Sequence, residues 1–123
     1  MLVLVKEPNQ DFSFLTWRVP VENAQRTRQI IETKVRHLLH CDRLWSIEVA
    51  EGLKLYYNPA AIKCGPQFKN CQIAFNPTQA LEVYGTLVAI RYQVLHPTSA
   101  PQRPVIFSEI TDVDFEYIKL LIS

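Results

Sequence analysis

The residues of this sequence best suited to metal chemistry are a histidine and a cysteine one helical turn apart. His37 and Cys41 are separated by four positions, a spacing that lets two side chains of an α-helix share one ligand. Cys64 and Cys71 would complete the four ligands of a tetrahedral zinc site. Six residues lie between these two cysteines, more than the roughly two to four of a zinc-binding turn. We therefore predict no bound metal and no cofactor. A Cys64–Cys71 disulfide is the alternative, and it would require an oxidising compartment that nothing else in the sequence indicates.

A second kind of chemistry is histidine-based acid–base catalysis. His37 and His40, with Arg36 beside them, are the residue types that flank a phosphate in a small hydrolase or nuclease. Histidines one turn apart on an exposed helix are more often simply solvated. The sequence has three glycines, too few for a glycine-rich phosphate loop, and it contains neither a GxSxG nor an HExxH motif. These residues favour a protein that is not an enzyme, and hydrolysis is our third hypothesis.

The segment 24–41 separates apolar from basic residues when it is wound as an α-helix. Its polar side carries Arg26, Arg36 and His40, and Arg28 and Lys34 flank the apolar stripe. The net charge of the segment is +3, whereas that of the whole chain is +1. We expect the arginines to face solvent. The apolar stripe consists of Ala24, Ile31, Val35, Leu38 and Leu39.

Acidic residues are concentrated near the C-terminus, where residues 108–123 carry a net charge of −3. One interpretation is that this segment neutralises the basic helix, within the fold or between subunits. Another is that the basic face of the helix is simply solvated. The alternatives are a separate protein partner, or a nucleic acid whose bases would stack on Trp45, Tyr56 or Tyr57. A net charge near zero weighs against nucleic acid, because domains that bind it usually carry a strong basic excess.

Aromatic residues near a predicted hairpin suggest an interface. Aromatic residues and arginine are the composition of interface centres, although core packing is the plainer explanation. We expect Tyr56 and Tyr57 to be exposed. The predicted binding residues are therefore Arg26, Arg36, His40, Tyr56 and Tyr57.

The elements that must position these residues follow from hydrophobic periodicity. A helix is predicted at 24–41, with Asn23 as its N-cap, and one helical turn at 78–83. The proline-rich segment 96–104 is predicted to be a loop. Residues 111–122 fit either a strand or a helix capped by Thr111 or Asp112, and their alternation favours the strand. Strands are predicted at 2–5, 11–19, 44–49, 53–57, 72–75, 86–95 and 105–107.

The resulting fold class is α+β, with a single domain over residues 1–123. We expect two layers, an antiparallel sheet of five or six strands and one long amphipathic helix packed on one face. A single helix would leave part of the sheet uncovered, and that face would then be open to water or to a partner.

Composition restricts the class of protein further. The chain is 48% hydrophobic and 20% charged, as in ordinary globular proteins, and its longest apolar runs are too short to span a bilayer. The N-terminal residues lack the basic region and cleavage site of a signal peptide. Three cysteines, an odd and low number, indicate reduced thiols in the cytoplasm. The leading hypothesis is a cytoplasmic, non-enzymatic accessory or assembly module that binds another protein or itself. The runner-up is a nucleic-acid-binding module, and no membrane role is expected.

Overall fold

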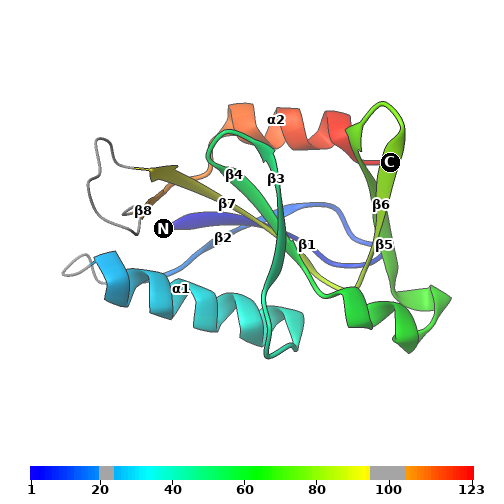
Figure 1. Cartoon of the computed structure of the whole chain (residues 1–123), viewed down its shortest axis with the longest axis horizontal. Helices are drawn as coiled ribbons and strands as arrows, with labels where there is room; N and C mark the ends of the chain where they lie inside the picture. The colour runs from blue at the N-terminus through cyan, green and yellow to red at the C-terminus, as the bar shows by residue number, and fades with distance from the viewer. Residues whose placement is uncertain (20–23, 95–104) are drawn as a thin grey trace.

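The computed structural model describes residues 1–19, 24–94 and 105–123. Within these ranges the chain forms two α-helices, a six-stranded antiparallel sheet and a separate two-stranded hairpin (Figure 1). The α+β class and the antiparallel sheet are therefore confirmed. The predicted N-cap Asn23 and the predicted loop at 96–104 lie outside the described residues.

The main sheet is built around its longest strand. Its order is β2-β1-β7-β4-β3, and β8 pairs with the far half of β7, beyond the end of β1. The position of β7 in the middle confirms the long central strand that the alternating residues predict. The predicted 44–49 and 53–57 hairpin is also present, as β3 and β4. The strands of this sheet are β1 (Leu2–Lys6), β2 (Ser13–Thr16), β3 (Trp45–Ala50), β4 (Leu53–Tyr57), β7 (Leu87–Val94) and β8 (Val105–Ser108).

Helix α1 (Ala24–Leu39) covers one face of this sheet. Its buried residues Ile31, Val35 and Leu39 recur every four positions, so they form one stripe along the helix. The stripe packs against β7 side chains that point to this side, including Val88 and Ile90. The predicted inward orientation of the apolar stripe is therefore confirmed, although the helix ends two residues earlier than predicted.

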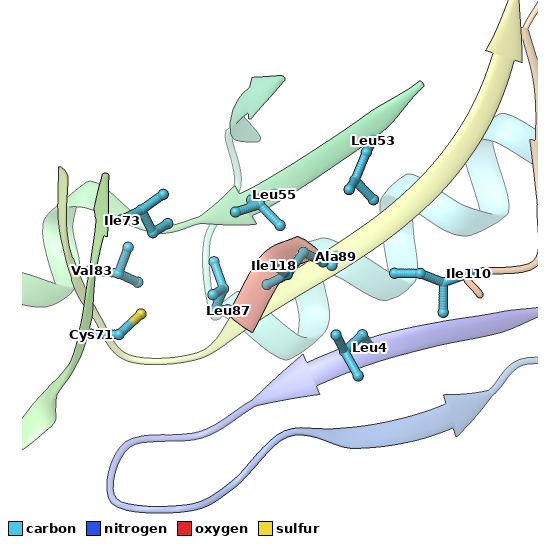
Figure 2. Close-up of a cluster of buried hydrophobic side chains, with 10 residues drawn as sticks. All are labelled: Leu4, Leu53, Leu55, Cys71, Ile73, Val83, Leu87, Ala89, Ile110 and Ile118. Atoms are coloured by element: carbon cyan, nitrogen blue, oxygen red, sulfur yellow. The ribbon is translucent and has the colours of Figure 1, made fainter. Parts of the chain in front are cut away.

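The opposite face is covered too, and here the predicted architecture is wrong. Helix α2 (Asp112–Leu121) and the hairpin of β5 (Lys69–Asn76) and β6 (Gln79–Tyr84) pack on that face, so the fold has three layers (Figure 1). The described residues thus contain two helices, of 16 and 10 residues, in place of one long helix. Figure 2 shows the cluster they enclose: Leu4, Leu53, Leu55, Cys71, Ile73, Val83, Leu87, Ala89, Ile110 and Ile118.

The segment that we expected to be a strand is α2. Thr111 accepts a hydrogen bond from the backbone N–H of Asp114 at 3.2 Å, and Asp114 accepts one from the N–H of Thr111 at 3.0 Å. This capping box satisfies two N–H groups that would otherwise be orphaned at the helix start. The helix then buries Ile118, which stabilises the fold by roughly 1.5–3 kcal/mol.

The hairpin also corrects a prediction, because residues 78–83 form most of β6 and no helical turn. The connection from β4 to the hairpin is two short 3₁₀ helices, η1 (Pro59–Cys64) and η2 (Pro66–Phe68). Asn70 anchors the hairpin to the main sheet, since its amide donates to the carbonyls of Lys6 and Gly85, each at 2.7 Å. The C-terminal residues after α2 also pair with β5, through a bridge between Ile73 and Ile122.

Candidate functional site

The predicted basic residues of α1 lie on the side of the helix that faces away from the sheet. Arg26 and His40 are exposed, and Arg36 is partly exposed. Arg26 and Arg36 are ten positions apart, so about 15 Å of helix separates them. Arg36 and His40 therefore share the C-terminal end of α1, whereas Arg26 marks the other end.

A single carboxylate organises the arginines along one flank of α1. Glu32 forms an ion pair with Arg28 at 2.9 Å and another with Arg36 at 3.5 Å. The Arg36 side chain also donates to the backbone carbonyl of Asp42 at 3.0 Å. Exposed pairs of this kind stabilise a helix by only about 0.3–0.5 kcal/mol each. Their main effect is to hold two guanidinium groups in place beside a carboxylate.

The C-terminal end of α1 has the hydrogen bonds of a Schellman motif. The N–H of Cys41 donates to the carbonyl of Arg36 at 3.2 Å, and the N–H of His40 donates to that of His37 at 3.4 Å. His40 therefore occupies the position where glycine is usual, and its φ is +52°. Asn58, at the end of β4, satisfies another terminal carbonyl by donating to Leu39 at 3.1 Å.

A hollow of about 790 Å³ opens beside this helix end. Six segments form its wall: the β1–β2 loop at 7–10, the end of α1, Asn58, each of the two 3₁₀ helices, and the turn between β6 and β7. A smaller hollow of about 320 Å³ lies among residues 36, 37 and 40–42. His40 lines both hollows.

Backbone strain coincides with the larger hollow. Among the described residues, Asn9 and His40 are the two non-glycine residues with a left-handed backbone, with φ of +63° and +52°. Both line this hollow. Such a conformation costs a residue with a Cβ atom about 1 kcal/mol, and it is often kept where a side chain must be aimed at a ligand. The hollow brings together residues 7–10 and Asn58, which are far apart in the sequence.

The structure separates the two tyrosines that were expected to be exposed together. Tyr56 is buried beneath α1, and burial, followed by the nearby Glu32 carboxylate, raises the pKa of Tyr56 to about 12. Tyr57 is only half-buried and packs against the cluster on the opposite face. Consecutive residues of a strand point to opposite faces, so the two side chains cannot form one patch. The predicted exposure of Tyr56 is therefore wrong.

An exposed aromatic residue does lie close to α1 in sequence. Trp45 is 42% exposed at the start of β3, and the guanidinium group of Arg43 lies 4.7 Å from the centre of its ring. This cation–π contact joins an arginine and an aromatic group, the combination that the sequence suggested for the tyrosines.

The acidic C-terminal segment does not neutralise α1 within the described fold. Most of it forms α2, which lies on the other side of the sheet (Figure 1), whereas Ser108 ends strand β8 and Glu109 pairs with the amino group of Met1. Asp114 pairs with Arg91 of β7, and Glu116 pairs with Lys119 of the same helix at 2.9 Å. The interpretation that the two segments pair within one molecule is therefore wrong.

The candidate zinc ligands are dispersed. Cys41 flanks the cluster beneath α1, Cys71 is buried in the cluster on the opposite face, and Cys64 is exposed on η1. Burial raises the pKa of both Cys41 and Cys71, which favours their protonated thiols over metal-binding thiolates. Across residues 1–19, 24–94 and 105–123, no three histidine, cysteine or acidic side chains are placed to hold a metal ion. All three cysteines are free, so the alternative disulfide is not formed.

Comparison with known proteins yields no relative, since no family model, curated protein or solved structure matches the chain. In the described part of the chain, no helix has the length and apolar character needed to cross a membrane.

Proposed function

We propose that this protein is a non-enzymatic accessory or assembly module that binds an acidic surface of another protein through α1. The contact surface, here called the α1 face, consists of Arg26, Arg28, Arg36 and His40. The observation that supports it most is the separation of charge: the sheet lies between α1 and the acidic C-terminal segment. Within the described residues the acidic segment forms no ion pair with α1, and this supports an acidic surface on a partner. The predicted cytoplasmic location belongs to the same proposal.

The arrangement of the arginines favours protein carboxylates over nucleic-acid phosphates. A guanidinium group can bind either a carboxylate or a phosphate in a bidentate geometry, so the preference comes from Glu32, which holds Arg28 and Arg36 in position. The same Glu32 carboxylate would repel a phosphate backbone, which binds best to an uninterrupted run of cations. Carboxylates on a partner can be spaced to avoid Glu32, whereas the phosphates of a duplex follow a fixed repeat.

The larger hollow offers a place for a side chain of the partner. Besides Cys64, the ionisable residues in the described part of its wall are Glu7 and His40. The Glu7 carboxylate accepts a hydrogen bond from the Thr86 hydroxyl at 2.8 Å. The remaining wall is mostly neutral, with Leu39 and Phe68 among its apolar residues. An uncharged side chain that follows an acidic residue in a partner would therefore suit the hollow.

The test is charge reversal on α1. Arg26→Glu combined with Arg36→Glu should weaken binding to an aspartate-rich model peptide about tenfold or more, because two attractions become repulsions. The matched control is Lys63→Glu with Lys119→Glu, which changes the net charge equally on exposed lysines outside α1. Fluorescence anisotropy gives both affinities, and thermal unfolding shows whether each variant folds.

Two results would contradict the proposal. Equal weakening by the control pair would mean that only net charge matters. Tighter binding to a duplex oligonucleotide than to the peptide, with log affinity falling linearly against log salt concentration, would favour the nucleic-acid hypothesis instead.

A further inference from the structure

The edge strand β2 is unusually open. All four of its residues are exposed, including the large apolar side chains of Phe14 (42%) and Leu15 (37%). It carries no charged residue or proline, and its register with β1 has no bulge. Natural edge strands are normally protected by one or more of these features. At four residues, β2 has only its short length as protection.

The other edge of the sheet shows what such protection looks like. Strand β3 carries Glu48, and its pairing with β4 is interrupted by an irregularity between Glu48 and Ala50. Tyr117 of α2 also donates its hydroxyl to the backbone carbonyl of Val49 at 3.0 Å. One edge of this fold is therefore blocked and the other is not.

The backbone of β2 presents a defined set of hydrogen-bonding groups to solvent. Trp17 and Met1 exchange two backbone hydrogen bonds, at 2.7 and 2.6 Å. Because bonded and non-bonded pairs alternate along antiparallel strands, Leu15 also bonds toward β1, whereas Phe14 and Thr16 direct their N–H and C=O groups outward. Within the described residues these outward groups have no hydrogen-bond partner.

We propose that β2 pairs with β2 of a second copy of this chain, so that two sheets join into one across a twofold axis. A twofold axis perpendicular to the sheet fixes the pairing. With the axis at Leu15, Phe14 of each copy lies opposite Thr16 of the other, and all the outward groups of both strands become hydrogen-bonded. Leu15 then faces its own copy on one face of the sheet. Phe14 keeps its contact with the ring of Phe115, at 5.6 Å, on the other.

The charges that flank β2 complement one another in this arrangement. Asp11 precedes the strand and Arg18 follows it; both are exposed, and neither forms an ion pair within the described chain. Antiparallel pairing brings Asp11 of each copy within about one residue, roughly 3.3 Å along the strand, of Arg18 of the other. The two side chains leave opposite faces of the sheet, because Phe12 packs on the α2 side and both Trp17 and Val19 pack on the α1 side. Their attraction therefore acts across the sheet without a direct ion pair, and by symmetry it occurs twice. A parallel pairing would instead set like charges side by side.

The dimer should be weak, because strands of this length bury less surface than a standard interface. Sedimentation equilibrium from micromolar to millimolar concentration should show a reversible monomer–dimer transition. Thr16→Pro should abolish it, since proline removes an outward N–H and leaves the bonds of Leu15 to β1. Circular dichroism and thermal unfolding of Thr16→Pro should match the parent protein and so report an intact monomer.

Exchanging the charges of Asp11 and Arg18 tests the strand pairing itself. It also provides a test of the proposal that does not depend on whether the proline variant folds. Asp11→Lys and Arg18→Glu should each weaken dimerisation about twofold to threefold, because each changes an attraction across the sheet at both ends of the interface. The two substitutions in one chain should restore it. Glu51→Lys with Lys63→Glu serves as the control for net charge. A parent protein that stays monomeric up to millimolar concentration, or a dimer indifferent to both the proline and the charge reversals, would overturn the proposal.

Discussion

Arg91 of the central strand β7 and Asp114 in the first turn of α2 form a bidentate ion pair. The Nε atom of Arg91 donates to Oδ2 of Asp114 at 3.1 Å, and Nη2 donates to Oδ1. Asp114 is 6% exposed and also belongs to the capping box with Thr111. One carboxylate thus starts the helix and ties it to the sheet, which explains how a 10-residue helix is held on that face.

Removing the arginine should therefore be costly. Arg91→Met leaves the Asp114 carboxylate buried without its cation, and we expect the free energy of unfolding to fall by about 3 kcal/mol. Urea denaturation measures this change. The control is Lys69→Met, which breaks an exposed pair with Glu82 and should cost about 0.5 kcal/mol or less. Equal costs would show that the Arg91 pair is no stronger than a surface pair.

The same pair predicts a dependence of stability on acid pH. Burial alone would raise the pKa of Asp114, but the hydrogen bonds from Arg91 and Thr111 outweigh it and lower the pKa below its ordinary value of 3.8. A carboxyl with a lowered pKa in the folded state contributes stability above its ordinary pKa and loses it as the pH falls. The free energy of unfolding should decline below about pH 5, and this decline should be smaller in Arg91→Met. An identical slope in both proteins would contradict the assignment.

The left-handed backbone of His40 should lower the free energy of unfolding of the protein. Because its backbone is left-handed, His40→Gly should raise the free energy of unfolding by up to about 1 kcal/mol, and the β-branched His40→Val should lower it. If His40 belongs to the α1 face, His40→Gly should bind the aspartate-rich peptide more weakly although it is more stable. A glycine variant that is less stable than the parent would show that the imidazole contributes to the fold.

Two buried tyrosines should titrate late in alkali. Burial raises the pKa of both Tyr56 and Tyr92 to about 12, with Glu48 adding to the shift of Tyr92. Absorbance of tyrosinate should show a phase near pH 12 that Tyr56→Phe and Tyr92→Phe each reduce by half. Because the folded pKa exceeds the unfolded value of about 10, the stability that these groups contribute is lost as the pH rises through this interval. A titration with no phase near pH 12 would contradict the burial of both rings.

Cysteine reactivity should follow exposure. A thiol reagent should label Cys64 quickly in the native protein, Cys41 more slowly, and Cys71 only on unfolding. Cys64→Ser should remove the fast phase and leave the others. Since Cys64 lines the larger hollow, a ligand that enters the hollow should protect it from labelling. Fast labelling of Cys71 would indicate that the hairpin opens readily from the sheet.

The helix of residues 24–39 and the β3–β4 hairpin were predictable because their information is local. Ile31, Val35 and Leu39 repeat with the period of a helix, and the hairpin alternates with the period of a strand. Arg26 and Arg36 lie on the outer side of the helix for the same reason, whereas His40 follows the end of the helix and is exposed there. A helix that buries one side must turn the other to solvent.

The residues misjudged from sequence are those whose environment comes from distant parts of the chain. Val113, Phe115 and Tyr117 alternate like a strand, but the capping box and the partner Arg91, 23 residues away, make the segment a helix. Tyr56 points to the face covered by α1 and Tyr57 to the opposite face, so different distant segments decide the burial of each ring. The larger hollow joins residues 7–10 to residues 58–68, which no local pattern connects. Periodicity thus determined which face of each element is apolar, whereas tertiary packing decided what covers that face, because burial free energy depends on all the segments that meet there.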